Sequence, residues 1–143
     1  MLALGTRFGQ GPVLIATLSK EESIPLKFLE GILLDLKSSG LLVSKKGKGG
    51  GYFLERSPAT ITVGSIIRMM EGPLAPLPCA SETAFRPCPE CPDVEHCGTR
   101  IVMRQVRDAI AEVLDTTTLA DVIRSVESIP RKDSDPGSLM YYI

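Results

Sequence analysis

Four cysteines crowded into one short stretch are the residues with the clearest chemical potential in this 143-residue chain. They are Cys79, Cys88, Cys91 and Cys97, and the sequence has no cysteine elsewhere. Thiolates bind iron–sulfur clusters and zinc, and they also form reversible disulfides. Residues 1–5 are apolar but short and lack a basic leader. We therefore expect no signal peptide, a cytoplasmic protein, and a metal or redox site rather than a disulfide framework.

The cysteine spacing leaves three interpretations open. An iron–sulfur cluster is the first. A structural zinc site of four thiolates is the second, and His96 could replace one of them. A metal-free thiol switch is the third, with Cys88 and Cys91 as the reactive pair. Four clustered thiols without any role are the least expected, because cysteine is confined to this stretch.

The segment that carries the cysteines, residues 72–97, is predicted to be an irregular loop. It contains six of the eleven prolines of the chain, which forbid a regular element across it. A helix over about 99–114 follows, with an apolar stripe close to heptad spacing: Val102, Val106, Ala109 and Val113. One small chain cannot easily cover such a stripe, so the long helix is predicted to pair two subunits in a homodimer.

Two helices are predicted before the middle of the chain. A short helix over 13–22 precedes a clearer one that begins near Pro25 and stops at Gly40. The second helix has an apolar face at positions i, i+3, i+4 and i+7: Leu29, Ile32, Leu33 and Leu36. This pair of helices has the order expected of a helix-turn-helix.

A β-hairpin follows the helix pair. Its predicted strands are 41–44 and 52–54, joined by a glycine-rich basic tip. Residues 60–62 either extend the hairpin or lead into a helix over 63–71, which Thr62 caps. The apolar face predicted for that helix consists of Val63, Ile66, Ile67 and Met70. A capping box at 118–121 opens a last helix. The predicted fold is mainly α with a small β-hairpin, a winged helix-turn-helix followed by a long dimerisation helix.

Double-stranded DNA is the partner that this arrangement indicates, because a helix fits the major groove and outward side chains read base edges there. Residues 1–68 carry nine Lys and Arg against five Asp and Glu, whereas residues 69–143 carry seven against twelve. A polyanion-binding first half would produce that asymmetry. A lysine-rich turn by itself would be only a soluble hairpin tip. The predicted DNA contacts are Lys27, Glu30 and Gly31 on the helix, and Lys45, Lys46, Lys48, Gly50 and Tyr52 on the hairpin.

Several runs of residues together resemble one known family. The runs are 24–30, 41–44, 48–52, 61–67, 70–73 and 114–121. With them the chain resembles, over residues 11–124, the bacterial winged-helix regulators of the IscR, NsrR and CymR type (the Rrf-two family). The resemblance implies a homodimeric transcription regulator whose long C-terminal helix pairs the subunits. For many members it also implies an iron–sulfur cluster on three cysteines before that helix, which here are Cys79, Cys91 and Cys97.

The chain departs from the family pattern in three respects. Only about eight residues remain of the full N-terminal helix with which members begin, so this helix looks truncated. Gly31 stands where members often have Gln, which changes the expected base preference. Cys88 is an extra cysteine, and Arg100 stands where one branch has a ligating histidine. Arg100 cannot ligate, so Cys88 is predicted to be the fourth ligand of a 2Fe–2S or 4Fe–4S cluster, with zinc as the alternative.

The sequence thus predicts a repressor or dual regulator that responds to redox state, nitric oxide or iron–sulfur status through a cysteine-ligated cluster. The alternatives are a cluster-free regulator with a structural zinc or a thiol switch, and one that acts through a metabolic enzyme partner. No nucleophile–base pair or phosphate loop points to an enzyme, and no apolar stretch is long enough for a membrane. The predicted divisions are a DNA-binding domain over 1–72, a cluster-binding loop over 73–98, dimerisation and final helices over 99–128, and a flexible tail over 129–143.

Overall fold

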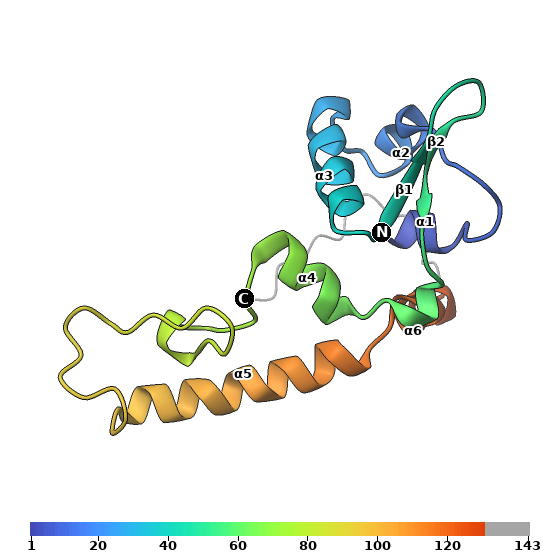
Figure 1. Cartoon of the computed structure of the whole chain (residues 1–143). Coiled ribbons are helices and arrows are strands. Elements are labelled where there is room, and N and C mark those ends of the chain that lie inside the picture. Colours follow the sequence, from blue (N-terminus) through green and yellow to red (C-terminus); the bar gives the residue numbers. More distant parts are fainter. Residues whose placement is uncertain (131–143) are drawn as a thin grey trace, which may run out of the picture.

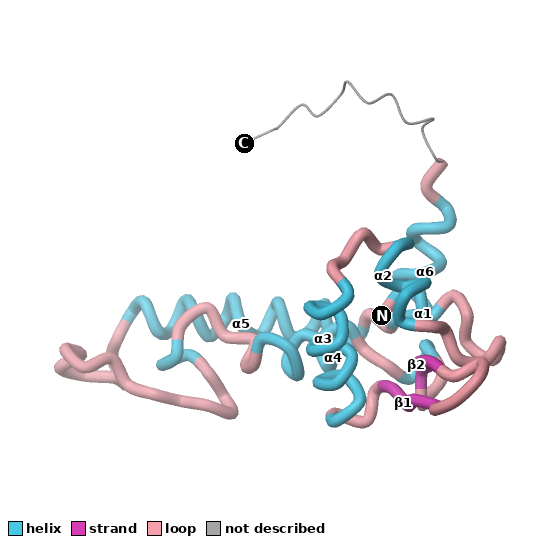
Figure 2. The backbone as a smooth tube through the Cα atoms, turned by 90° about the horizontal axis from the view of Figure 1, so that it is seen from above, coloured by secondary structure: helices cyan, strands magenta, loops and turns pink. Residues whose placement is uncertain are grey.

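The computed structural model describes residues 1–130, and residues 131–143 lie outside the described part of the chain. Figure 1 shows two regions, which we call the winged unit (residues 1–72 and 117–130) and the arm (residues 73–116). The arm consists of a long helix and the loop that runs beside it. In Figure 2, turned by 90°, the long helix again extends away from the winged unit.

Three helices open the winged unit: α1 (Leu2–Gly5), α2 (Ile15–Glu21) and α3 (Leu26–Ser38). The predicted helix pair is therefore confirmed. Pro25 occupies the N-cap position of α3, and Gly40 follows its end with a left-handed φ of 74°. The predicted apolar face is also correct, because Leu29, Leu33 and Leu36 are buried and Ile32 packs against them.

Helix α1 is a single turn. Its Leu4 is buried in the core of the winged unit. Gly5 lies against α6, where a Cβ would press on the side chain of Ile123. The short helix is thus packed into the fold.

The wing is an antiparallel hairpin of β1 (Leu42–Lys45) and β2 (Gly51–Leu54), in which Leu42 pairs with Leu54 and Lys45 with Gly51. Both strands lie within one residue of their predicted bounds. The backbones of Val13 and Tyr52 exchange two N–H···O bonds of 2.9 Å. These bonds tie the segment before α2 to the edge of the wing.

A short 3-10 helix η1 (Pro58–Thr60) leads into α4 (Val63–Glu71), so residues 60–62 do not extend the hairpin. The Thr62 hydroxyl accepts the Ser65 N–H at 3.1 Å, which confirms the predicted cap. The predicted apolar face is only partly correct. Ile66 packs against the core together with Met69, whereas Met70 is exposed. The face shifts because α4 lies between α3 and α5 and contacts both.

The arm contains the 3-10 helix η2 (Pro78–Ala80) and the helix α5 (Gly98–Thr116), and α6 (Leu119–Ser128) follows it. Apart from η2, the cysteine loop has no regular element, as its prolines predict. The capping box of α6 is confirmed. Thr118 Oγ1 accepts the Asp121 N–H at 3.1 Å, and the Asp121 carboxylate accepts the Thr118 N–H at 2.9 Å.

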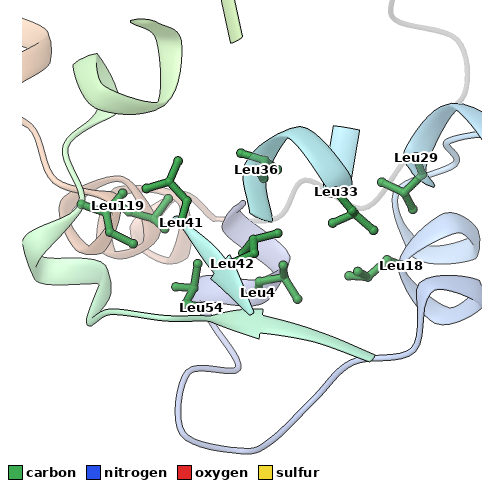
Figure 3. Close-up of a cluster of buried hydrophobic side chains, with 10 residues drawn as sticks. Leu4, Leu18, Leu29, Leu33, Leu36, Leu41, Leu42, Leu54 and Leu119 are labelled. Carbon is green, nitrogen blue, oxygen red and sulfur yellow. The ribbon is translucent and has the colours of Figure 1, made fainter. Parts of the chain in front are cut away.

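A cluster of ten apolar side chains forms the core of the winged unit (Figure 3). Its members are Leu4, Leu18, Leu29, Leu33, Leu36, Leu41, Leu42, Leu54, Ile61 and Leu119. Leu119 belongs to α6, so the last helix packs with the first half of the chain, whereas the sequence analysis grouped it with the long helix. Two backbone bonds attach the start of α6 to the segment before α4: the Leu119 N–H donates to Ile61 O at 2.8 Å, and the Val63 N–H donates to Thr117 O at 2.9 Å.

Within residues 1–130, no helix is both long and apolar enough to cross a membrane. The flexible tail predicted over 129–143 falls, beyond residue 130, outside the described residues.

Candidate DNA interface, cysteine loop and connecting joint

The three helix residues predicted to contact DNA lie together on α3. Lys27, Glu30 and Gly31 are all exposed. Helical geometry turns them away from Leu29 and Leu33, which face the core. No other part of residues 1–130 fills the space beside Gly31, where an added Cβ would meet nothing within 4 Å. The outer side of α3 is therefore accessible to a large partner molecule.

Phe28 is a candidate contact that the sequence analysis missed. Its side chain is 68% exposed, which is uncommon for an aromatic residue in a helix that packs on a core. The signal was present in the sequence, because Phe28 falls outside the apolar stripe of α3. An exposed aromatic edge on such a helix can make apolar contact with a thymine methyl group.

The tip of the wing carries three exposed lysines, Lys45, Lys46 and Lys48. Figure 1 shows this tip projecting beyond the helices of the winged unit. Gly47 and Gly49 have left-handed φ values of 93° and 78°, which other residues adopt only with strain. The glycines thus shape a tight turn that presents three ammonium groups to solvent.

The other two predicted wing contacts, Gly50 and Tyr52, sit closer to the body of the protein. Gly50 is buried, and a Cβ there would overlap the carbonyl oxygen of Lys45. Tyr52 is half-buried and packs against the core. The structure accounts for both by packing, and their contact with DNA stays a prediction.

The four cysteines occupy different settings in the arm. Cys79 lies in η2 and is only 5% exposed, and Cys97 is the N-cap residue of α5. Cys88 and Cys91 share one turn, in which the Cys91 N–H donates to Cys88 O at 3.2 Å. Cys88 is exposed, and all four are free thiols. The loop thus combines one buried thiol, one thiol at a helix start, and two thiols that share a turn.

The thiols act on one another electrostatically. The pKa of Cys88 is raised, mainly because the Cys79 side chain hydrogen-bonds to it, and the charges of Cys79, Cys91 and Cys97 act in the same direction. Among the described residues, however, no three Cys, His, Asp or Glu side chains are grouped closely enough to hold a metal ion. The four thiols are nevertheless donors of the kind that bind an iron–sulfur cluster or zinc.

His96 is engaged elsewhere. Its Nδ1 lies 2.7 Å from Asp93 Oδ2, and Asp93 Oδ1 accepts the N–H groups of Glu95 and His96. This contact lowers the pKa of Asp93, with the His96 side chain as its main cause. The geometry gives His96 a role in shaping the loop, so the thiols remain the better candidates for ligands.

Two arginines of α5 hold the cysteine loop. Arg100 Nε donates to Cys79 O at 2.9 Å, and its Nη1 donates to Val94 O at 3.4 Å. Arg107 Nη1 donates to Ala80 O at 2.8 Å. Arg100, which cannot ligate a metal, thus fastens both ends of the loop to the helix.

The apolar stripe of α5 is not covered by its own winged unit. Val102, Val106, Ile110 and Val113 are all exposed, and within the described residues α5 has no buried side chain. Of the predicted stripe, Val106, Ala109 and Val113 line an open apolar groove together with Ile110 and Leu114. A contiguous exposed patch of this kind marks an interaction surface.

A joint connects the arm to the winged unit. The Arg68 guanidinium of α4 pairs with the Asp115 carboxylate of α5 through two bonds of 2.5 and 2.7 Å. This pair raises the pKa of Arg68 and lowers that of Asp115. Gly64 is buried beneath it, and a Cβ at that position would overlap the Asp115 carboxylate. The sequence runs 61–67 and 114–121, which contain Gly64 and Asp115, therefore meet in this contact.

Helices α2 and α3 lie beside a two-stranded wing. The tip of the wing is basic, and the outer side of α3 is exposed. These features define a winged helix-turn-helix DNA-binding protein. Comparison with known proteins narrows this class. Residues 1–125 match the family model Rrf2, described as an iron-dependent transcriptional regulator. The chain belongs to the Rrf2 family, and it is a transcription regulator.

Individual relatives agree with this assignment. An rrf2-like HTH-type transcriptional regulator of Rhodobacter capsulatus is 37% identical over 109 residues, covering 76% of this chain and 73% of its own. CymR of Bacillus subtilis is 32% identical over 143 residues, covering 100% of this chain and 91% of its own.

Solved structures of similar proteins have the same fold. The structure of B. subtilis CymR, titled the global cysteine regulator, has a TM-score of 0.71 at 31% identity and covers 87% of each chain. The structure of T. potens IscR has a TM-score of 0.70 at 30% identity and covers 93% of this chain and 84% of its own. These likenesses confirm the predicted fold class. The relatives are named as transcription regulators, which are not enzymes, so the predicted absence of enzyme activity is confirmed as well.

Proposed function

We propose that this regulator binds palindromic double-stranded DNA as a homodimer, in the cytoplasm, and that the state of its cysteine loop changes its affinity for DNA. One observation carries the proposal. Helix α5 follows directly on its N-cap residue Cys97 and ends beside the joint of Arg68 with Asp115, so a single nineteen-residue helix links the thiols to the winged unit. A coupling of about 1–3 kcal/mol between the two ends is enough for a switch.

The exposed residues of α3 and of the wing have different roles in DNA binding. Lys45, Lys46 and Lys48 contact phosphates and supply affinity that does not depend on sequence. Lys27 reaches guanine or phosphate, and Glu30 accepts a hydrogen bond from cytosine N4. Two copies of α3 in one dimer read half-sites about 10 base pairs apart.

The dimer forms along the exposed apolar stripe of α5. A second copy of the same stripe covers Val106 and its neighbours on both helices, as in other two-fold interfaces. The arm then lies at the centre of the dimer, and the two winged units lie on either side of it. Any change of the arm therefore alters the spacing of the two reading helices.

The predicted ligands of an iron–sulfur cluster are Cys79, Cys91 and Cys97, with Cys88 as the fourth. A bound 2Fe–2S or 4Fe–4S cluster would supply a centre that is sensitive to oxygen, nitric oxide and iron supply. The chain itself contributes the buried anchor at Cys79, the helix start at Cys97, and the Arg100 bonds that keep the two ends of the loop together.

A thiol switch without metal is the second candidate. It is supported by the turn that Cys88 and Cys91 share, in which the Cys91 N–H donates to Cys88 O at 3.2 Å, because the turn keeps the two predicted reactive thiols in one short segment. A structural zinc on the same thiolates is the third.

Anaerobic purification with analysis of iron, acid-labile sulfide and zinc separates the three. Brown protein that contains iron and sulfide, and loses both in Cys91→Ser, is the expected result. Colourless protein with one zinc per chain contradicts the sensor. Metal-free protein whose DNA binding changes on thiol oxidation supports the thiol switch.

Fluorescence anisotropy with a set of DNA duplexes tests the division of roles. Lys48→Ala is expected to weaken all sequences alike and to reduce the salt slope by about one unit. Glu30→Ala is expected to change the preferred base instead. The reverse pattern contradicts the roles proposed for helix and wing. Loss of all salt-dependent DNA binding, with a stable enzyme complex in a pull-down, would favour a metabolic enzyme partner.

A further inference from the structure

The face of α5 opposite the apolar stripe carries three arginines whose joint role the switch does not explain. Arg100, Arg104 and Arg107 are spaced i, i+4 and i+7, so they share one side of the helix. All three line one open cavity of about 240 Å³, together with Ser81, Phe85 and other residues of the loop. They lie in the half of the chain that is acidic overall. A convergence of guanidinium groups in a concave site is a pattern that recognises anions.

A second, smaller cavity of about 40 Å³ lies toward α4. Ser81, Glu82 and Arg107 line both cavities, and Arg68 and Thr83 line the smaller one. The two cavities thus share part of their lining, and we call the larger one, which the three arginines line, the groove. Because the groove and the apolar stripe occupy opposite faces of α5, dimerisation along the stripe leaves the groove accessible.

The arginines differ in how fully they are engaged. Arg100 and Arg107 donate to loop carbonyls, and Arg107 also pairs with Asp108. The ion pairs formed within residues 1–130 do not include Arg104, which is exposed at the middle of the row. A guanidinium has five N–H donors, so even the engaged arginines keep donors for a ligand. Arg104 is thus the group most ready to bind an anion, and its neighbours can complete the site.

We propose that this groove binds a small phosphate or carboxylate anion as an effector. The volume suits inorganic phosphate or a short polycarboxylate, and it is below the usual size of drug-sized ligand sites. The bound anion bridges α5 and the loop beside the Arg107–Ala80 contact, so it stabilises the loop in the arrangement described here. Binding itself is independent of the proposed thiol switch, whereas its effect on DNA rests on the proposed DNA binding.

Calorimetric titration of the full chain with inorganic phosphate and, separately, with citrate tests the site and distinguishes the two anion classes. Saturable binding of at least one of them is expected. Arg104→Gln is expected to weaken it roughly tenfold or more, because a charge-assisted hydrogen bond is lost. Glu82→Gln removes the carboxylate that repels an anion, so it is expected to tighten binding.

Arg56→Gln is the matched control, since Arg56 is exposed on the winged unit and the charge change is the same. An equal loss in Arg56→Gln and Arg104→Gln would show general charge attraction and overturn the site, as would the absence of saturable binding. DNA affinity of Arg104→Gln without added anion serves as the second measurement. If it equals that of the unmodified chain, and added anion changes the DNA affinity of the unmodified chain but not of Arg104→Gln, the effector site stands whatever the cysteine loop binds. An anion that leaves the DNA affinity of the unmodified chain unchanged overturns the effector role.

Discussion

The winged unit and the arm are stabilised in different ways. The winged unit encloses ten buried apolar side chains drawn from α1, α2, α3, the hairpin, α6 and the segments before the hairpin and before α4. The arm keeps its long helix almost wholly exposed and holds its loop through arginine bonds to carbonyl groups. Apolar burial is the main driving force for folding, so the winged unit can be stable within one chain. The arm offers its apolar surface outward, which suits a region that works through partners and bound groups.

The largest effect is expected in the winged core. Leu42 is 1% exposed and pairs with Leu54 across the hairpin. Leu42→Ala removes packed apolar surface and leaves a cavity, so the free energy of unfolding should fall by about 2–5 kcal/mol. Urea unfolding followed by circular dichroism measures this loss. A decrease below about 1 kcal/mol, the usual effect of an average substitution, would contradict the view that the winged unit carries its own stability.

A charge in the arm should act on assembly rather than on folding. Val106→Glu places a carboxylate in the exposed apolar stripe, which a second copy is proposed to cover. The dimer dissociation constant should rise by about 100-fold or more, because an unpaired charge is costly to bury. Analytical ultracentrifugation measures the change. Ala59→Glu adds the same charge to an exposed position of the winged unit and should leave the dimer intact. Equal sedimentation of both variants and the unmodified chain would remove the arm from the interface.

The joint between the two regions can be tested by how Gly64→Ala changes the free energy of unfolding. Gly→Ala inside a helix ordinarily stabilises by about 0.5–1 kcal/mol. Gly64→Ala should instead bring no such stabilisation, because its Cβ overlaps the Asp115 carboxylate and displaces it from the ion pair with Arg68. Arg68→Ala removes the same pair and should cost about 0–1 kcal/mol, since that pair is partly exposed.

Denaturant unfolding in a double-mutant cycle locates the cause. In an Asp115→Ala background, Gly64→Ala should recover the ordinary stabilising effect. If Gly64→Ala has the same effect in both backgrounds, the joint is not the reason for the glycine.

The smallest effect concerns the capping box of α6. The pKa of Asp121 is lowered to about 2, mainly by a hydrogen bond from the Thr118 side chain, and further by the Thr118 N–H and Arg124. The unfolded pKa is about 3.9, so the unfolded chain binds this proton more tightly. The contribution of Asp121 is therefore present above about pH 4 and is lost as the pH falls toward 2. The urea midpoints of the unmodified chain and Asp121→Asn should differ at pH 6 and converge near pH 2; a difference independent of pH would argue against the carboxylate.

Much of the winged unit could be predicted because its signals are local. The i, i+3, i+4, i+7 spacing of Leu29, Ile32, Leu33 and Leu36 sets the buried face of α3, and glycines mark the hairpin tip. The candidate site was predicted less completely. Phe28 was missed because it lies outside the apolar stripe, and only the packing of its neighbours shows that it is exposed.

The sequence by itself determined the helices, the hairpin, the cap at Thr62 and the capping box at Thr118, since each depends on residues within a few positions of one another. Only the tertiary structure decided that α6 packs into the winged core, that Gly64 lies under Asp115, and that arginines of α5 bond to loop carbonyls. These contacts join residues that are far apart along the chain. Their formation depends on how whole elements pack, which no local pattern of residues specifies.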